Sequence, residues 1–167
     1  EASADITGLI GQYAHGNEPS HHITYMYAYA GQQWKTAEKV RYIMDEFYKD
    51  TPDGIIGNED CGQMSAWYIL SSMGFYQMNP ADGVYVFGSP RFDKMSVKVR
   101  GGKTFTVEAE NNSKENIYIQ KVFLNGKPYK KTYIIYDDIL NGSTLKFVMG
   151  KKPNKAFGKE AVDRPTV

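Results

Sequence analysis

The sequence predicts an α+β fold in which helices come first and strands follow. The chain has 167 residues, 41% of them hydrophobic, which suits one medium domain or two small ones with a real core. Helical spacing of apolar residues continues to about residue 76 and then changes to short β-rich runs between turn signals. We therefore expect a helical part over 1–80, a β-rich part over 81–150 and a charged, weakly ordered tail over 151–167.

Apolar stripes with helical spacing mark the first part. One stripe predicts a helix over 1–15, and its members are Ile6, Leu9, Ile10 and Tyr13. A short buried helix is expected over 22–30, ended by Gly31. Thr36 is the expected N-cap of a helix over 37–49. The stripe of that helix consists of Val40, Ile43, Met44 and Phe47.

Six strands are expected in the second part, over 84–87, 95–99, 104–108, 116–124, 133–136 and 144–149. Apolar residues alternate with polar ones along the second and third of these runs, which is typical of half-buried antiparallel strands. Asn125-Gly126 is a hairpin signal because both residues tolerate positive φ.

A glycine-bounded turn over 57–62 holds two acids and an amide directly before an apolar, helix-like run. Asp60 and Gln63 stand three apart, which is the spacing of a capping box. Asp60 would then be the N-cap of a helix over 61–73 that ends at Gly74, and the helix end would keep its carboxylate ionised. Asp60 is either a cap only, or a carboxylate fixed in a cleft as a general base or metal ligand.

A second polar loop covers residues 15–22 and contains all three histidines of the chain. Clustered histidines allow a zinc site, but the adjacent His21 and His22 point in different directions on a helix or a strand. Asn17 and Glu18 offer oxygen ligands, which suit Ca²⁺ better. The alternative is a hydrogen-bonded surface turn without a ligand.

Composition excludes several classes of protein. A net charge of +1 gives no electrostatic reason to bind nucleic acid or membranes. Cys61 is the single cysteine, so an internal disulfide is excluded, and we expect it to be a small buried residue. No apolar run reaches the roughly 18 residues of a membrane span. The chain begins without methionine, which is consistent with a fragment or a processed form.

Several short motifs follow one another along about 75 residues of the sequence. They are His-Gly-Asn-Glu-Pro-Ser-His-His (15–22), Tyr-Ala-Gly-Gln-Gln-Trp-Lys-Thr (29–36), the acidic turn through Trp67, Met-Gly-Phe-Tyr (73–76) and Gly-Ser-Pro (88–90). Over residues 1–150 the chain resembles the C-terminal part of glycoside hydrolase family 92. Linked motifs in order are far more specific than any one of them alone.

The resemblance implies an activity and an architecture. Members of the family are calcium-dependent, inverting exo-α-mannosidases, mostly secreted or periplasmic in bacteria, and they pair a β-sandwich with an (α/α)₆ barrel. The chain would supply the last barrel helices and then antiparallel strands of the sandwich. Its partners would be the rest of a longer parent enzyme and a mannose-containing glycan, with α-1,2 as the expected linkage.

The resemblance also implies roles for particular residues. Asp60 matches the general base, and Asn58 matches a position that is often aspartate and assists at the metal or the water. Asn17 and Glu18 match calcium-proximal residues, so the expected metal ligands are these two and Asn58.

His21 and Gln63 would support the substrate sugar or the loop. The general acid would be a glutamate upstream of residue 1. The chain alone is therefore expected not to hydrolyse mannosides, since half of the acid–base pair is missing.

Two other classes of function remain open on the sequence. The chain has 14% aromatic residues, including 13 tyrosines, which would also suit a module that holds glycan through aromatic side chains without catalysis. It could also be a purely structural module whose acidic turn only caps a helix. The enzyme hypothesis requires Asp60 to share one site with Asn17 and Glu18.

Overall fold

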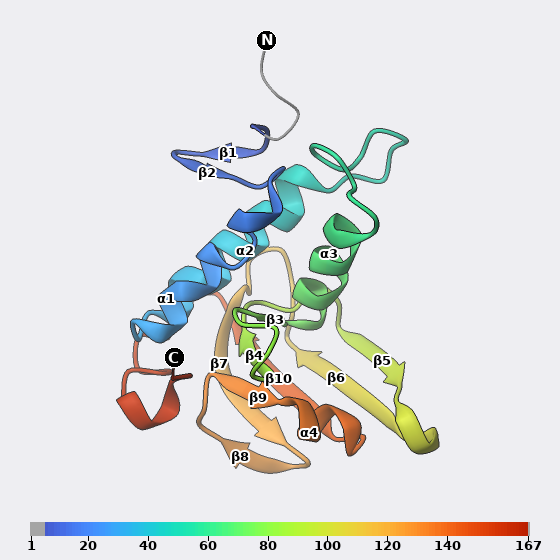
Figure 1. Ribbon diagram of the computed structural model, residues 1–167. Helices are drawn as coiled ribbons and strands as arrows, with labels where there is room; N and C mark the ends of the chain where they lie inside the picture. Colours follow the sequence, from blue (N-terminus) through green and yellow to red (C-terminus); the bar gives the residue numbers. More distant parts are fainter. Residues whose placement is uncertain (1–5, 167) are drawn as a thin grey trace.

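A computed structural model describes residues 6–166 and places the main helices on one side of two β-sheets (Figure 1). The helices are α1 (Met26–Tyr29), α2 (Gln33–Phe47), α3 (Gln63–Met73) and α4 (Tyr136–Leu140), with short 3₁₀ turns at Glu18–Ser20, Ile23–Tyr25, Arg100–Gly102 and Ala161–Asp163. The strands are β1 (Leu9–Ile10), β2 (Tyr13–Ala14), β3 (Phe75–Gln77), β4 (Val84–Phe87), β5 (Lys94–Lys98), β6 (Thr104–Glu110), β7 (Tyr118–Leu124), β8 (Lys127–Tyr129), β9 (Tyr133–Ile135) and β10 (Thr144–Gly150).

The larger sheet has the strand order β5-β6-β10-β7-β8, and the smaller one has the order β3-β4-β9. All neighbouring pairs are antiparallel except β6 and β10, which run parallel, with Phe147 opposite Ala109. The expectation of antiparallel strands is therefore wrong for this pair. Periodicity shows which residues face the core, but it carries no information about which strand enters between β6 and β7.

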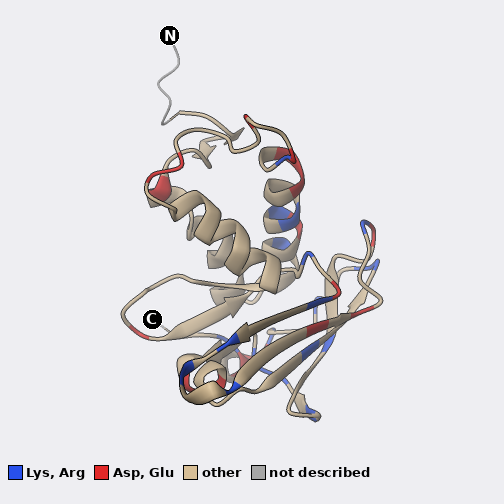
Figure 2. Ribbon diagram, turned by 90° about the vertical axis from the view of Figure 1, so that its right-hand side faces the viewer, with Lys and Arg blue, Asp and Glu red and all other residues tan. Residues whose placement is uncertain are grey.

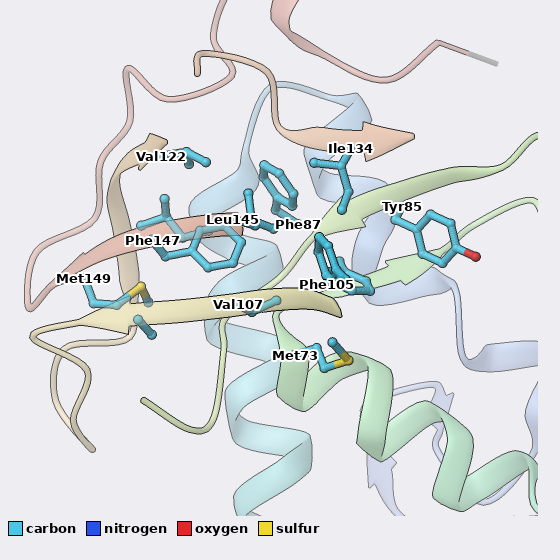
Figure 3. Close-up of a cluster of buried hydrophobic side chains, with 13 residues drawn as sticks. Met73, Tyr85, Phe87, Phe105, Val107, Val122, Ile134, Leu145, Phe147 and Met149 are labelled. Atoms are coloured by element: carbon cyan, nitrogen blue, oxygen red, sulfur yellow. The ribbon is translucent and has the colours of Figure 1, made fainter. Parts of the chain in front are cut away.

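The first hydrophobic cluster joins the end of α3 to both sheets (Figure 3). Phe87 and Phe147 pack edge to face with ring centroids 5.1 Å apart, and Phe75 and Phe105 do so at 6.1 Å. Met73 lies over them from α3. Since a fully buried Phe or Leu contributes roughly 1.5–3 kcal/mol, this cluster fixes α3 on the sheets.

The second cluster lies between the helices and β4, and it contains Tyr25, Ala28, Val40, Ile43, Met44, Trp67 and Val86. It confirms the stripe expected on α2, because Val40, Ile43 and Met44 are almost fully buried. Figure 2 shows the complementary pattern, with charged positions on the outward side of α2 and acidic positions in the turn before α3. The second cluster therefore sets the distance between α2 and α3.

Arg41 links α2 to the loops of the β-rich part. Only 3% of this residue is exposed, and its guanidinium donates to Ser89 Oγ at 3.2 Å, to Asn112 Oδ1 at 2.8 Å, and to the carbonyls of Pro90 and Ser113. Burial lowers the pKa of Arg41 to about 10, so the group stays charged at neutral pH. The two parts of the chain are thus joined by a buried cation that neutral acceptors surround.

The helix expected over 1–15 is wrong in the part that the structure describes. Residues 9–14 form the hairpin β1–β2, and residues 1–5 lie outside the described range. Gly8 has φ +63° and Gly11 has φ +61°, so both take the left-handed conformation that ends a helix. The apolar spacing was real, but the two glycines decided the local structure.

Two other helix boundaries differ from expectation. Thr36 is not an N-cap: α2 begins at Gln33, and the Thr36 hydroxyl donates to the Thr24 carbonyl at 2.9 Å from inside the helix. The short helix over 22–30 is confirmed as a 3₁₀ turn that continues into α1 and stops before Gly31, whose φ is +74°.

The tail expected to be weakly ordered is packed onto the β-rich part. Phe157 contacts the first cluster, and the backbone N–H of Thr132 donates to the Asp163 carbonyl at 2.8 Å. The charged composition of the tail gives no sign of these two contacts. The hairpin expected at Asn125-Gly126 is confirmed, with φ of 51° and 77° at the turn between β7 and β8.

The six expected strands are present with boundaries shifted by two residues at most, whereas β3, β8 and α4 were not expected. Within residues 6–166 no helix has the length and apolar character needed to cross a bilayer, and α2, at 15 residues, is the longest of them.

Arg41→Met should lower the free energy of unfolding by about 2–4 kcal/mol, because it leaves several buried acceptors without a donor. Urea unfolding followed by tryptophan fluorescence measures this change. Arg100→Met is the matched control, since Arg100 is exposed and should change stability by less than about 0.5 kcal/mol. Equal effects of the two substitutions would contradict the role given to Arg41.

Candidate active site

The loop over 15–22 and the turn over 57–62 lie against each other at the start of α3. Gly57 has φ +76°, and a Cβ there would lie 3.0 Å from Gly16 Cα, so this close approach requires glycine. The backbone N–H of Gly16 donates to the Thr7 carbonyl at 3.1 Å, which holds the first loop against the segment that leads into β1. The two polar stretches of the sequence therefore form one site.

Glu59, not Asp60, carries the cap of α3. The helix begins at Gln63, with Gly62 before it at φ +97°, and Asp60 makes no side-chain cap. The Glu59 carboxylate instead accepts from the backbone N–H of Ser65 at 3.0 Å and from that of Gly62. The capping box predicted at Asp60 is wrong, because Asp60 and the next residue have φ of 50° and 57° and turn the chain before the helix starts.

Hydrogen bonds from the Ser65 side chain and backbone hold the pKa of Glu59 below its usual range. Sequence reasoning missed this residue, although an acid just before a helix is the available signal. The three-residue spacing to Gln63 belongs to Asp60 and not to Glu59, so spacing alone predicts the cap at Asp60.

The carboxyl groups of Glu18 and Asp60 come within hydrogen-bonding reach of each other. The pKa of Asp60 is raised, first by the hydrogen bond with Glu18, then by desolvation and by the charges of Glu18 and Glu59. The expectation that a helix end keeps Asp60 ionised therefore has the wrong sign, because the nearest groups are carboxylates. One oxygen of Glu18, Oε1, is buried without a hydrogen-bond partner among residues 6–166.

Asn17 and Asn58 flank the carboxyl pair in sequence. Asn17 is half-buried just before the 3₁₀ turn that starts at Glu18, and the Asn58 side chain is exposed. In the described residues no three His, Cys, Asp or Glu side chains gather in a metal-binding arrangement. Any cation here would need further oxygens beyond the carboxylates of Glu18 and Asp60.

His15 is fully buried between the two loops. Its Nδ1 pairs with the Tyr13 hydroxyl at 2.7 Å and its Nε2 with the Tyr48 hydroxyl at 2.7 Å, so neither nitrogen is free for a metal. Burial, and next the charge of His21, lower the pKa of His15 to about 3. These contacts rule out the zinc alternative for His15.

His21 and Gln63 are joined directly. Gln63 Nε2 lies 3.3 Å from His21 Nδ1 and donates to the Tyr76 hydroxyl at 3.1 Å. His21 is 1% exposed, and the indole of Trp67 donates to its carbonyl at 3.1 Å. His21 is therefore a buried support of the loop. Cys61, expected to be buried, is exposed beside Asp60, because its left-handed backbone turns it outward.

Comparison with known families decides which protein class these loops belong to. The model of the glycosyl hydrolase family 92 catalytic domain matches residues 1–151. The chain belongs to this family. The resemblance of the ordered motifs is thereby confirmed.

Solved family 92 structures are close to the chain. An α-mannosidase from Bacteroides thetaiotaomicron is 44% identical with a TM-score of 0.92, and the match covers 95% of this chain and 22% of that one. An inverting mannosidase from the same organism is 42% identical with a TM-score of 0.87, and the match covers 93% of this chain and 21% of that one. A protein of Arthroderma benhamiae described as an uncharacterized secreted glycosidase is 39% identical over 140 residues, which are 82% of this chain and 18% of that protein.

The chain thus spans about one fifth of the length of these relatives. Its mixture of helices with mainly antiparallel sheets agrees with the family 92 structures. The geometry brings Glu18, Asp60, His21 and Gln63 together, while the roles given to these residues and to the two asparagines stay predictions.

As the pH is lowered, the free energy of unfolding should fall faster in the unsubstituted chain than in the His15→Gln variant. The unfolded chain takes up a proton at His15 near pH 6.5, whereas the folded chain keeps it neutral to about pH 3. Stability from this group is therefore complete above 6.5 and is lost as the pH falls, by about 1.4 kcal/mol per unit. Urea unfolding at pH 6, 5 and 4 measures the slopes, and parallel slopes would contradict the neutral, buried state of His15.

Proposed function

We propose that the chain is the C-terminal part of an inverting, calcium-dependent exo-α-mannosidase that removes terminal mannose from glycans, with α-1,2 as the linkage. Membership of family 92 supports hydrolysis of a glycoside. Two relatives described as mannosidases, one of them inverting, support the sugar and the stereochemistry. A further structure of the α-mannosidase relative is a complex with mannoimidazole.

The contact between Glu18 and Asp60 is the observation that carries this proposal. Both carboxyl groups belong to loops that other residues hold together, and Asp60 is exposed to an incoming ligand. A structural cap would satisfy its oxygens on backbone N–H groups, as Glu59 does. Asp60 instead lies beside a second carboxyl group that raises its pKa, and carboxyl groups with shifted pKa values cluster at functional sites.

In the proposed reaction Asp60 acts as the general base. Its carboxylate takes a proton from water while the water oxygen forms a bond to C1 of the mannose. The glycosidic C–O bond breaks, and its oxygen takes a proton from a general acid, so the configuration at C1 inverts. The carboxyl groups of the acid and the base in inverting glycosidases stand roughly 6.5–9.5 Å apart. We place the acid on a part of the parent outside this chain. The raised pKa of Asp60 places the acid limb of activity at a higher pH than an isolated aspartate would.

Calcium fits the donor set of the site. Asn17, Glu18 and Asn58 offer only amide and carboxylate oxygens, which are the ligands that Ca²⁺ takes. Oε1 of Glu18, which is buried without a hydrogen-bond partner in the described part of the chain, is an oxygen that a cation would satisfy. Bound there, the ion would supply positive charge to orient sugar hydroxyls, and the remaining ligands would come from water or from the rest of the parent.

We assign the rest of the architecture on the same basis. The helices α2 and α3 would close an (α/α)₆ barrel, and the larger sheet would join a β-sandwich formed with the N-terminal part of the parent. His21 and Gln63 would support the sugar-binding loop. Export to the periplasm or medium of a bacterium would give the enzyme access to glycans, as for the secreted relative.

In the parent enzyme, Asp60→Asn should lower kcat by about 10²–10⁴-fold with little change in sugar affinity, because it removes the base and keeps the shape. Turnover of an α-mannoside and calorimetric binding of mannose measure the two effects. Asp53→Asn is the matched control, since Asp53 is an exposed acid of the preceding loop. Turnover near the parent value in Asp60→Asn would remove the catalytic role.

The pure 167-residue chain should release no mannose from α-mannosides, with or without calcium, because the proposal places the partner acid on the rest of the parent and the chain spans about one fifth of its relatives. Chromatographic assay of free mannose after long incubation measures this. Adding the separately produced remainder of the parent is the positive control. Calcium-dependent release by the chain alone would show that its own residues complete the acid–base pair.

A further inference from the structure

Both loops of the candidate site are attached to His15, a residue that the catalytic proposal does not use. We propose that His15, acting with Tyr48, is a positioning residue that fixes the Glu18 loop against the start of α3 and so holds Asp60 in register. The proposal rests on the function given above, and it goes further by naming the group on which the geometry of the site depends.

The first connection runs through the His15 ring to α3. The Tyr48 hydroxyl donates to the Met64 carbonyl at 3.2 Å, so its oxygen must accept the proton of His15 Nε2. Nδ1 then lacks a proton and accepts from the Tyr13 hydroxyl. Each group therefore donates to the next, from Tyr13 in β2 through His15 and Tyr48 to the carbonyl of Met64, the second residue of α3.

The second connection runs through the His15 backbone. Its carbonyl accepts from His21 Nε2 at 3.0 Å, which leaves His21 Nδ1 as the acceptor for Gln63 Nε2. Gln63 is the first residue of α3, and its backbone N–H donates to the Asp60 carbonyl at 3.2 Å. This second series of bonds thus ends on Asp60 itself.

Packing leaves His15 no alternative position. Its ring stacks on His21 with centroids 4.7 Å apart and meets the Trp67 ring edge-on at 4.4 Å. A histidine that served packing alone would not need both ring nitrogens and its carbonyl engaged. The two series reach the first two residues of α3, Gln63 and Met64, so loss of either one would let the acidic turn shift relative to Glu18.

Such a shift matters because the two carboxyl groups repel each other when both are ionised. Any loosening between the loops would let them separate. Displacement of a reacting group by about 1 Å can cost about 10²-fold in rate. His15 would therefore act on turnover through Asp60, without touching the substrate.

Hydrogen exchange in the chain tests the attachment without using activity. In His15→Phe, which keeps an aromatic ring but lacks both nitrogens, the backbone amides of Gly62 and Ser65 should exchange at least about tenfold faster. Amides of the central strand β10 should be unchanged. His15→Gln supplies one donor and one acceptor and should restore slow exchange.

Tyr48→Phe should have the same effect as His15→Phe, because it removes the bond to α3. Tyr25→Phe is its matched control: Tyr25 is fully buried, and its hydroxyl bonds Ser71 at 2.8 Å, away from the two loops. If His15→Phe and Tyr48→Phe speed exchange at the start of α3 no more than Tyr25→Phe does, the positioning role is overturned.

In the parent enzyme, His15→Phe should lower kcat about 10²-fold with KM within about threefold, and His15→Gln should recover most of the loss. An equal loss in both variants would show that the ring is needed only for packing and would overturn the proposal. A parent without mannosidase activity would refute the proposed function instead, and the exchange experiment would still decide whether His15 positions the turn.

Discussion

The contact between the carboxyl groups of Glu18 and Asp60 is the constraint on which the site depends. The pKa of Asp60 is raised first by the hydrogen bond with Glu18, then by desolvation and by the charges of Glu18 and Glu59, so the contact is least favourable when both carboxyl groups are ionised. Nothing in the acidic turn favours the contact by itself, because Asp60 is exposed and does not cap α3. The surrounding structure must therefore supply the free energy that keeps the two loops together.

That free energy comes from a buried aromatic and polar cluster in place of regular secondary structure. His15, His21, Tyr48 and Trp67 pack ring against ring, and most of their polar atoms have named partners. A loop as polar as 15–22 could not be fixed by apolar burial alone. Satisfied hydrogen bonds make such a network rigid, and Oε1 of Glu18 is a buried oxygen of this loop without a partner among residues 6–166.

The sequence predicted the elements whose signal lies within one element. The stripe of α2, the six main strands and the turn at Asn125-Gly126 follow from periodicity and from turn residues. The parallel pair β6–β10, the anchored tail and the cap by Glu59 depend on partners distant in space or on an unusual backbone at Asp60. Spacing alone predicts that Asp60 caps α3, whereas Glu59 accepts the hydrogen bonds at the start of this helix.

The surface and the site together favour a chain that functions as part of a larger enzyme. Ile6, Leu9, Ile23 and Met26 are each 42–56% exposed, although apolar residues of this size are mostly buried in complete domains. The relatives are about five times longer. The proposed Ca²⁺ would give a partner to Oε1 of Glu18, which is buried without one among residues 6–166, beside the exposed carboxyl group of Asp60. Under the proposed function, the rest of one parent enzyme would cover these apolar side chains and supply the remaining groups of the acidic site.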